Sequence, residues 1–417
     1  MMIKHLLKQI WTQRAVNAWL WIELIVVAVC LAYVTDYLYV TAKIYYSPLG
    51  ADVEHVYRVD LAEVAPESND YLTTENDSTR IERLFDVLAR LRAYPGVEAV
   101  SVSDGSHPYN QRSMSGSRGI DTTWVHASIY RVSPEFFRVF HITDKQGQIS
   151  PLVSAATQQN VWIASAEAER QFAQSGVVAQ GSGIKEWGEE EPHHTVAAIC
   201  EDVRFNDFNP VYPVYYECYS EAEILNTRGV RTEFCVRVSP EADDAGFASR
   251  FRKDLKTQLR LGNIHLLEIT SFGDIRDNYY RSGGQINDVK TRLAALCFLL
   301  VNILLGVVGT FWIRTQQRRA EVGLRLALGS SHTGIRSLLM FEGLLLLGLA
   351  AIPALIISLN LGWADLLGSD LLPFTIARFI MVEAITLILM GLMIVAGIYL
   401  PARQAMKIQP ADALREE

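Results

Sequence analysis

The stretch RTQQRRAEVGLRLALGSSHTGIRSLLMFEGLLLL, Arg314–Leu347, decides the fold, because in it a short basic segment runs directly into a long apolar one. From Arg318 to Leu328 the apolar residues recur at helical spacing. Glu321 and Arg325 stand at the i,i+4 distance at which opposite charges stabilise a helix. The apolar side of this predicted helix carries Ala320, Leu324, Ala327 and Leu328. The stretch predicts a basic surface helix followed by a membrane span.

Capping residues separate these two elements. Gly329 can adopt the left-handed backbone that ends a helix, because glycine has no Cβ to clash there. Ser330 or Ser331 can then accept a hydrogen bond from the first free N–H groups of the next helix. The residues alone leave two roles open for the basic helix: an anchor on the membrane surface, or a docking element for a cytosolic partner.

Four apolar segments of about twenty residues or more are long enough to cross ~30 Å of hydrocarbon. They are 19–41, 293–313, 337–360 and 379–400. The first is too long for a signal-peptide core and lacks a clear cleavage site, so we expect a retained anchor. It contains Glu23 and Asp36, which we expect near the membrane interfaces or facing neighbouring helices.

Positive charge sets the predicted orientation of these spans. The chain has a net charge of −8, yet three of its segments carry eleven Lys or Arg against four Asp or Glu. These segments are 1–18, 314–336 and 401–417. Because Lys and Arg accumulate on the cytosolic side, we predict that both termini and the loop 314–336 lie inside. The loop 361–378 and the long segment 42–292 then lie outside, and no basic stripe suggests nucleic acid as a partner.

The segment 42–292 reads as an α+β domain. Two β-α-β-like units are predicted from alternating and helical apolar patterns. Their ranges are 54–63, 79–93 and 97–102 for the first unit, and 232–238, 245–261 and 264–270 for the second. We expect these units to bracket a β-rich insertion at about 105–230, and the polar stretch Ser103–Gly119 at the first junction to be mobile.

Motifs for catalysis or metal binding are missing from this sequence. The glycine-rich phrase GSGIK lacks the spacing of a phosphate-binding loop, and neither GxSxG nor HExxH occurs. His193 and His194 are adjacent, so in a strand they would point to opposite faces and could not clamp one ion. Cys200, Cys218 and Cys235 permit one disulfide and equally permit free thiols. We predict a protein that is not an enzyme and holds no metal or cofactor.

The same stretch resembles the signature of MacB/FtsX-like ABC transporter permeases. The pattern RxxExGLRxALGSS leads into a span with an early Glu342, and the tail PARQAMKIQPADALREE, Pro401–Glu417, is similar to that family's C-terminal tail. The phrases IYRVSPEFFRVF and HTVAAICEDVRF look like its MacB-like periplasmic core domain. The resemblance touches nearly the whole chain, and the two cytosolic motifs are its most specific parts.

This resemblance implies a fold and a set of partners. The fold is four transmembrane α-helices with a large α+β periplasmic domain between the first and the second. The protein would be a bacterial inner-membrane permease, forming a homodimer or a heterodimer with a related permease. A cytosolic ABC ATPase would bind the ATP, and we expect it on a separate polypeptide because only about eighteen residues precede the first span. A periplasmic adaptor and an outer-membrane channel are further candidate partners.

The implied activity is mechanotransmission, in which ATP hydrolysis moves the membrane helices and so drives work in the periplasm. That work would be efflux of a compound or peptide, or the handling of a lipoprotein. The residues implied to couple the chain to the ATPase are Arg318, Arg319, Glu321, Gly323, Leu324, Arg325, Ala327 and Gly329. The alternative is a membrane-anchored periplasmic sensor or binding module without an ATPase, which explains poorly why three spans and a basic loop follow the outer domain.

Overall fold

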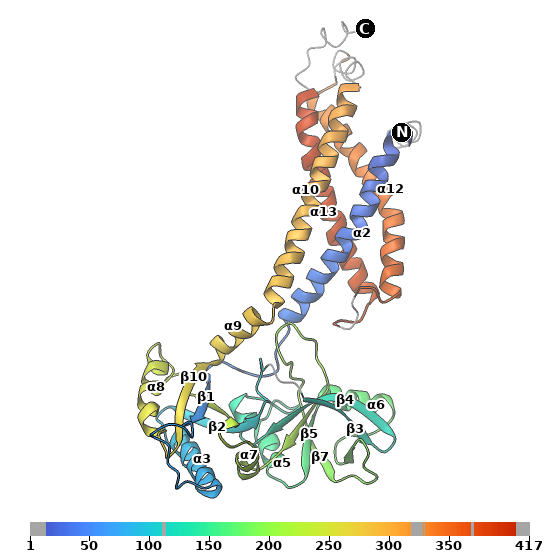
Figure 1. Cartoon of the computed structure of the whole chain (residues 1–417). Coiled ribbons are helices and arrows are strands. Elements are labelled where there is room, and N and C mark those ends of the chain that lie inside the picture. The colour runs from blue at the N-terminus through green and yellow to red at the C-terminus, as the bar shows by residue number, and fades with distance from the viewer. Residues whose placement is uncertain (1–13, 111–113, 318–327, 329, 368–370, 406–417) are drawn as a thin grey trace. The chain divides into compact units, whose positions relative to one another are not determined.

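The computed structural model describes residues 14–110, 114–317, 328, 330–367 and 371–405 (Figure 1). The chain divides into two compact units. One is formed by Tyr46–Gly284, and we call it the α+β unit. The other combines the chain before Tyr46 with the chain after Gly284, and we call it the helical unit. Each is described by itself below.

The helical unit is built from long apolar helices: α2 (Arg14–Tyr45), α10 (Gln285–Gln317), α12 (His332–Trp363) and α13 (Ile376–Ala405). Each holds a stretch of at least 24 residues that is apolar and long enough to cross a membrane. At ~1.5 Å per residue the shortest stretch extends over about 36 Å, more than the ~30 Å of hydrocarbon. The four spans predicted from the sequence are thus confirmed as membrane-length helices, with the α+β unit between the first and the second.

Side chains from all four helices form one core in the helical unit. Examples that are almost fully buried are Leu31 of α2, Ile303 of α10, Ala350 of α12 and Met390 of α13. α10 begins at Gln285, eight residues before the predicted apolar span at Leu293, because the polar residues between them contain no helix-breaking residue. The start of a helix and the start of its apolar stretch are therefore different residues here.

The two predicted β-α-β-like units of the α+β unit interleave in one half of its sheet. The first contributes β1 (Val56–Glu63), α3 (Asp77–Arg92) and β2 (Val97–Asp104). The second contributes β9 (Glu233–Val238), α8 (Phe247–Gln258) and β10 (Ile264–Ser271). The strand order is β10-β1-β9-β2, and every pairing is antiparallel. This is a split β-α-β arrangement, and its core lies between the strands and α3 and α8.

The chain between these units forms a second half in which the strand pairings close into a ring. Its strands are β3 (Met114–Ile120), β4 (Thr123–Val132), β5 (Val161–Ser165), β6 (Gly183–Glu186), β7 (His194–Cys200) and β8 (Val214–Cys218). Their order is β4-β3-β6-β7-β5-β8, and β8 also pairs with β4. Closure leaves none of these strands with a free edge. Only Ser103 and Asp104 of β2 pair with β4, so the two halves share a short seam.

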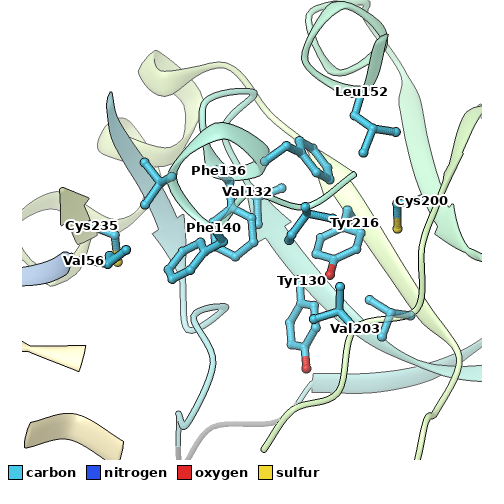
Figure 2. Packing of buried hydrophobic residues seen from close by; sticks show 14 of the residues in the cluster. Val56, Tyr130, Val132, Phe136, Phe140, Leu152, Cys200, Val203, Tyr216 and Cys235 are labelled. Atoms are coloured by element: carbon cyan, nitrogen blue, oxygen red, sulfur yellow. The ribbon is translucent and has the colours of Figure 1, made fainter. Parts of the chain in front are cut away.

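A buried aromatic cluster joins the two halves of the α+β unit (Figure 2). Phe136 begins the short helix α4 (Phe136–Val139) and Phe140 directly follows it. Both lie with Tyr216 of β8 on one side and Val56 of β1 on the other. The remaining short helices are α5 (Ser150–Ala156), α6 (Ala166–Gln174), α7 (Glu221–Arg228), η1 (Gly229–Arg231) and α9 (Phe272–Ser282). Phe272 of α9 belongs to the same cluster, so the helix that precedes α10 is packed onto the body of the unit.

The polar stretch Ser103–Gly119 contains a paired strand and buried residues where the structure describes it. Where it is described, its second part is strand β3, which pairs with β4 from Met114 to Ile120. In its first part, Ser106 and His107 are buried. In the described residues, strand pairing and buried hydrogen bonds use polar groups that a composition argument assigns to solvent, and the mobility of the junction stays a prediction.

Candidate functional site

The predicted coupling residues lie between α10 and α12. All of them fall outside the described residues: Arg318, Arg319, Glu321, Gly323, Leu324, Arg325, Ala327 and Gly329. The helix before them ends at Gln317, and the helix after them begins at His332. Ser331 caps α12, because its Oγ accepts a hydrogen bond from the Gly334 N–H at 3.1 Å. One of the two predicted capping serines is thereby confirmed.

A buried ion pair links the first and last helices of the helical unit. Arg378, near the start of α13, donates from Nε and Nη2 to the two carboxylate oxygens of Asp36 in α2, at 2.8 and 2.5 Å. The side chains are only 3% and 5% exposed. Arg378 also donates to the backbone carbonyls of Leu367 and Leu372 in the preceding loop. This fork-shaped pair therefore ties α2, α13 and that loop together.

Other carboxylates also face the interior of the helical unit. Glu23 of α2 lies against α10, where a Cβ on Gly306 would come within 2.4 Å of its Oε1. Glu342 of α12 and Glu383 of α13 are 2% and 6% exposed. Glu383 and Asp36 line one small cavity. The prediction that Glu23 and Asp36 face neighbouring helices is confirmed.

In the α+β unit, one loop holds the segment that follows α2. We call residues 202–209 the anchor loop and residues 46–52 the incoming segment. The Arg204 N–H donates to the Leu49 carbonyl at 2.8 Å, and the Arg204 side chain donates to the carbonyls of Ser47 and Pro48. Gly50 (φ +81°) lies so close to the loop that a Cβ there would be 2.0 Å from the Asp202 carbonyl oxygen. The incoming segment is thus fixed by direct backbone contact.

The same anchor loop holds α9, which leads into α10. Asp207 accepts a hydrogen bond from the Tyr280 hydroxyl at 2.6 Å and an ion-pair contact from Arg276 Nε at 2.9 Å. The Asp207 N–H donates back to the Tyr280 hydroxyl oxygen at 3.0 Å. Beside it, Asn206 Nδ2 donates to the Tyr279 hydroxyl oxygen at 3.0 Å. Two neighbouring tyrosines of α9 are therefore bound to two neighbouring residues of the loop.

The loop residues that make these contacts are shielded from water. Arg204, Asn206 and Asp207 are 2%, 1% and 7% exposed. Burial raises the pKa of Tyr280, and the hydrogen bond to Asp207 raises it further, so the hydroxyl stays a protonated donor at neutral pH. Burial lowers the pKa of Arg204, although an arginine keeps its charge under any ordinary condition. A cleft of about 620 Å³ opens beside these residues and is lined by Phe205, Asn209 and Tyr279 among others.

The cysteines and histidines have structural surroundings. All five cysteines are free, so the possible disulfide among Cys200, Cys218 and Cys235 does not form. Burial raises the pKa of Cys218 to about 12, which leaves almost no reactive thiolate at neutral pH. His194 stacks on Trp162 with ring centroids 4.9 Å apart, as expected of a structural residue. No group of three His, Cys, Asp or Glu suited to a metal occurs in the parts of the chain that the structure describes.

The anchor loop was missed by reasoning from sequence. Its residues follow β7 in the phrase EDVRFNDFNP, which contains no catalytic or ligand motif. A weak signal existed in the pair Tyr279–Tyr280, because two adjacent tyrosines just before an apolar span need partners for their hydroxyls when they are buried. That signal could not name Asp207, which lies more than seventy residues away along the chain.

Comparison with known proteins finds similarity to one family in the last third of the chain. The family model described as FtsX-like permease C-terminal matches residues 293–410. The macrolide export ATP-binding/permease protein MacB 1 of Yersinia pestis bv. Antiqua (strain Antiqua) is 25% identical over 353 residues, covering 82% of this chain and 50% of that protein. The pyoverdine export ATP-binding/permease protein PvdT of Pseudomonas syringae pv. syringae (strain B728a) is 24% identical over 202 residues, covering 48% of this chain and 29% of that protein.

The chain thus spans about half the length of the curated relatives it matches. Among solved structures, the periplasmic region of MacB from Actinobacillus actinomycetemcomitans aligns with 14% identity and a TM-score of 0.34, covering 57% of this chain and 97% of that one. A domain of a putative permease from Porphyromonas gingivalis aligns with 14% identity and a TM-score of 0.35, covering 54% and 92%. The family and sequence matches confirm the predicted resemblance to MacB/FtsX-like permeases, which rests on residues 293–410 for the FtsX-like part.

Proposed function

From the similarity of residues 293–410 to FtsX-like permeases, we propose that this chain is the permease part of an ABC transporter in a bacterial inner membrane. A cytosolic ABC ATPase docks on the loop between α10 and α12 and supplies the ATP hydrolysis. The α+β unit lies in the periplasm and performs the work, which is efflux of a compound or peptide or the handling of a lipoprotein. The match of residues 293–410 is the observation that carries this proposal.

Other observations support it. The curated relatives are named as ATP-binding/permease proteins for export, and this chain covers 50% of the MacB relative and 29% of the PvdT relative. The basic loop carries Arg314, Arg318, Arg319, Arg325 and Arg336 against Glu321 alone, which favours a cytosolic position for it. Interior carboxylates such as Glu342 are costly in a membrane span, and such residues are typical of proteins whose helices have a working interior.

The proposed mechanism is mechanotransmission through rigid helices. ATP binding and hydrolysis at the docked ATPase shift the cytosolic ends of α10 and α12. α10 is one continuous helix of 33 residues, so a displacement at one end reaches the other without a break in its hydrogen-bond ladder. The chain runs from the N-terminal end of α10 directly into α9 and the α+β unit. The transporter acts as a dimer of such permeases, with a periplasmic adaptor and an outer-membrane channel as candidate partners.

The first prediction concerns orientation. Cysteines introduced at Ser115, which is exposed in the α+β unit, and at Gly368 should react with a membrane-impermeant maleimide added outside. Cysteines introduced at Gln317 and Gln409 should react only after the cells are opened. The reason is the asymmetry of Lys and Arg between the loops. The measurement is the labelled fraction of each variant before and after permeabilisation.

The unsubstituted chain is the control for this labelling. Its Cys200 and Cys235 are buried, and burial raises the pKa of both thiols, so they contribute little background. If the Gln317 variant is labelled in intact cells as fully as the Ser115 variant, the loop between α10 and α12 lies outside. The predicted orientation is then wrong, and a cytosolic ATPase cannot dock on that loop.

The second prediction concerns docking. If Leu324 packs into a groove on the ATPase, Leu324→Asp buries an unpaired carboxylate at that contact and weakens binding by several kcal/mol, on the order of a hundredfold or more. The ATPase should then be lost from the purified complex, and its activity should no longer respond to the permease. The measurements are recovery of the ATPase with the tagged permease in mild detergent, and ATP turnover in nanodiscs.

Two further variants make this test specific. Arg318→Ala removes a charge from the same segment without burying one, and it should have the milder effect. Gly329→Val should weaken docking without any change of charge, because a β-branched residue cannot easily adopt the left-handed cap. If the Leu324→Asp variant still binds the ATPase normally, the docking role is wrong and the segment is a membrane-surface anchor. Repeated purification without any ATPase would favour the sensor alternative.

A further inference from the structure

Both chain connections of the α+β unit are bound to the same short loop. The incoming segment follows α2 and is bound by Arg204, and α9 precedes α10 and is bound by Asp207. These two loop residues are three positions apart, and they also contact each other, since Arg204 Nη1 donates to the Asp207 carbonyl at 3.1 Å. A continuous path of hydrogen bonds therefore runs from Pro48 through the anchor loop to Tyr280.

The loop itself is held rigid between these two connections. Asn206 Oδ1 accepts hydrogen bonds from the N–H groups of Phe208 and Asn209 at 2.8 and 2.9 Å. The Phe208 ring packs on Tyr280 with centroids 5.1 Å apart. The buried polar groups of this loop therefore have hydrogen-bond partners. One end of the loop cannot move without the other, because each displaced group would leave its partner without a hydrogen bond.

One of the strained backbone positions of the chain contacts the anchor loop. Tyr109 has a φ of +61°, which costs a residue with a Cβ about 1–3 kcal/mol. Its N–H donates to the Phe205 carbonyl at 3.1 Å, and its hydroxyl donates to Asp207 at 3.2 Å. The contacts of the anchor loop therefore hold Tyr109 in a conformation that it would otherwise leave.

We infer that the anchor loop 202–209 couples the incoming segment to α9, so that displacements arriving along α2 and α10 move the α+β unit as one body. The inference rests on the proposed function. In a permease that works by mechanotransmission, displacements that reach the α+β unit through two chain connections act together when one rigid loop binds both connections. Arg204, Asp207 and Tyr280 are positioning residues in this scheme and contact no substrate.

The third prediction tests this coupling by hydrogen–deuterium exchange of the full chain in nanodiscs. Tyr280→Phe removes one hydroxyl from α9 and should speed exchange roughly five- to tenfold, the effect of about one net hydrogen bond. The increase should appear in peptides covering α9 and also in those covering the incoming segment, where the Asp52 N–H is bonded to the Phe140 carbonyl. Arg204→Lys changes the side of the loop that binds the incoming segment. It should also speed exchange in α9, which tests the coupling from the other end.

Tyr94→Phe is the matched control. The Tyr94 hydroxyl donates to Asp254 of α8 at 2.9 Å in the same unit, and neither residue belongs to the incoming segment, the anchor loop or α9. This variant should leave both peptides at the wild-type rate. If Tyr280→Phe speeds exchange in α9 alone, the two connections are independent and the inference is wrong. The experiment needs no ATPase, so a failure of the docking prediction would leave its outcome unaffected.

Discussion

Arg378→Met should destabilise the helical unit by about 3–5 kcal/mol, the range for a buried ion pair that loses one partner. The substitution keeps an unbranched apolar stem, removes the guanidinium group, and leaves Asp36, which is 5% exposed, as an uncompensated buried carboxylate. It also leaves the carbonyls of Leu367 and Leu372 without their donor. The measurement is thermal unfolding of the full chain in detergent, followed by a signal from a label on α13.

The double variant Asp36→Leu, Arg378→Met provides the decisive comparison. It removes both charges, so most of the lost stability should return, because a buried pair contributes little beyond its own desolvation cost. An exposed pair serves as the control: Asp70 and Arg260 are 72% and 69% exposed, and Asp70→Ala should change the unfolding midpoint very little. If Arg378→Met is as stable as Asp70→Ala, Asp36 must become protonated or solvated when it loses Arg378, and the expected destabilisation is wrong.

Gly50→Ala should destabilise the α+β unit by at least about 3 kcal/mol. Two costs add at this position. The φ of +81° disfavours any residue with a Cβ, and that Cβ would lie 2.0 Å from the Asp202 carbonyl oxygen. Since a backbone atom cannot rotate away, the incoming segment must separate from the anchor loop. The free energy of unfolding, measured with denaturant and a probe in this unit, reports the loss.

Gly147→Ala separates these two costs. Gly147 has a φ of +77°, close to that of Gly50, and nothing lies within 4 Å of a Cβ built there. This variant should carry the backbone penalty alone, about 1–2 kcal/mol. Equal losses for the two variants would mean that the close approach between Gly50 and Asp202 contributes nothing, and the anchor loop would then not hold the incoming segment by contact.

Much of the architecture follows from local patterns. The four long helices are readable because an apolar run of twenty residues has few alternatives to a membrane span, whatever its surroundings. The strands at Val161–Ser165 and His194–Cys200 are likewise marked by short buried runs between polar turns. The helix cap at Ser331 is a local hydrogen bond within four residues, and a local rule predicts it.

Pairing between distant strands is not readable in this way. Val56–Glu63 and Glu233–Val238 lie side by side in the sheet, although about 170 residues separate them in the chain. About 80 residues separate the strands of the closing pair, β4 and β8. Alternation within one strand predicts which face is buried and says nothing about which strand is the neighbour. For that reason the β-rich insertion could be predicted, and its closed ring of pairings could not.

The sequence by itself determined four membrane-length helices, the α+β character of the segment between the first two, and the basic charge of residues 314–336, because these depend on periodicity, length and charge within short windows. Tertiary structure alone decided that Asp36 would meet Arg378 across 342 positions, and that Arg204 and Asp207 would hold both ends of the α+β unit. The physical reason is the cost of burying an unpaired group. A charged or polar group that is removed from water needs a partner, and the fold determines which distant residue is within reach.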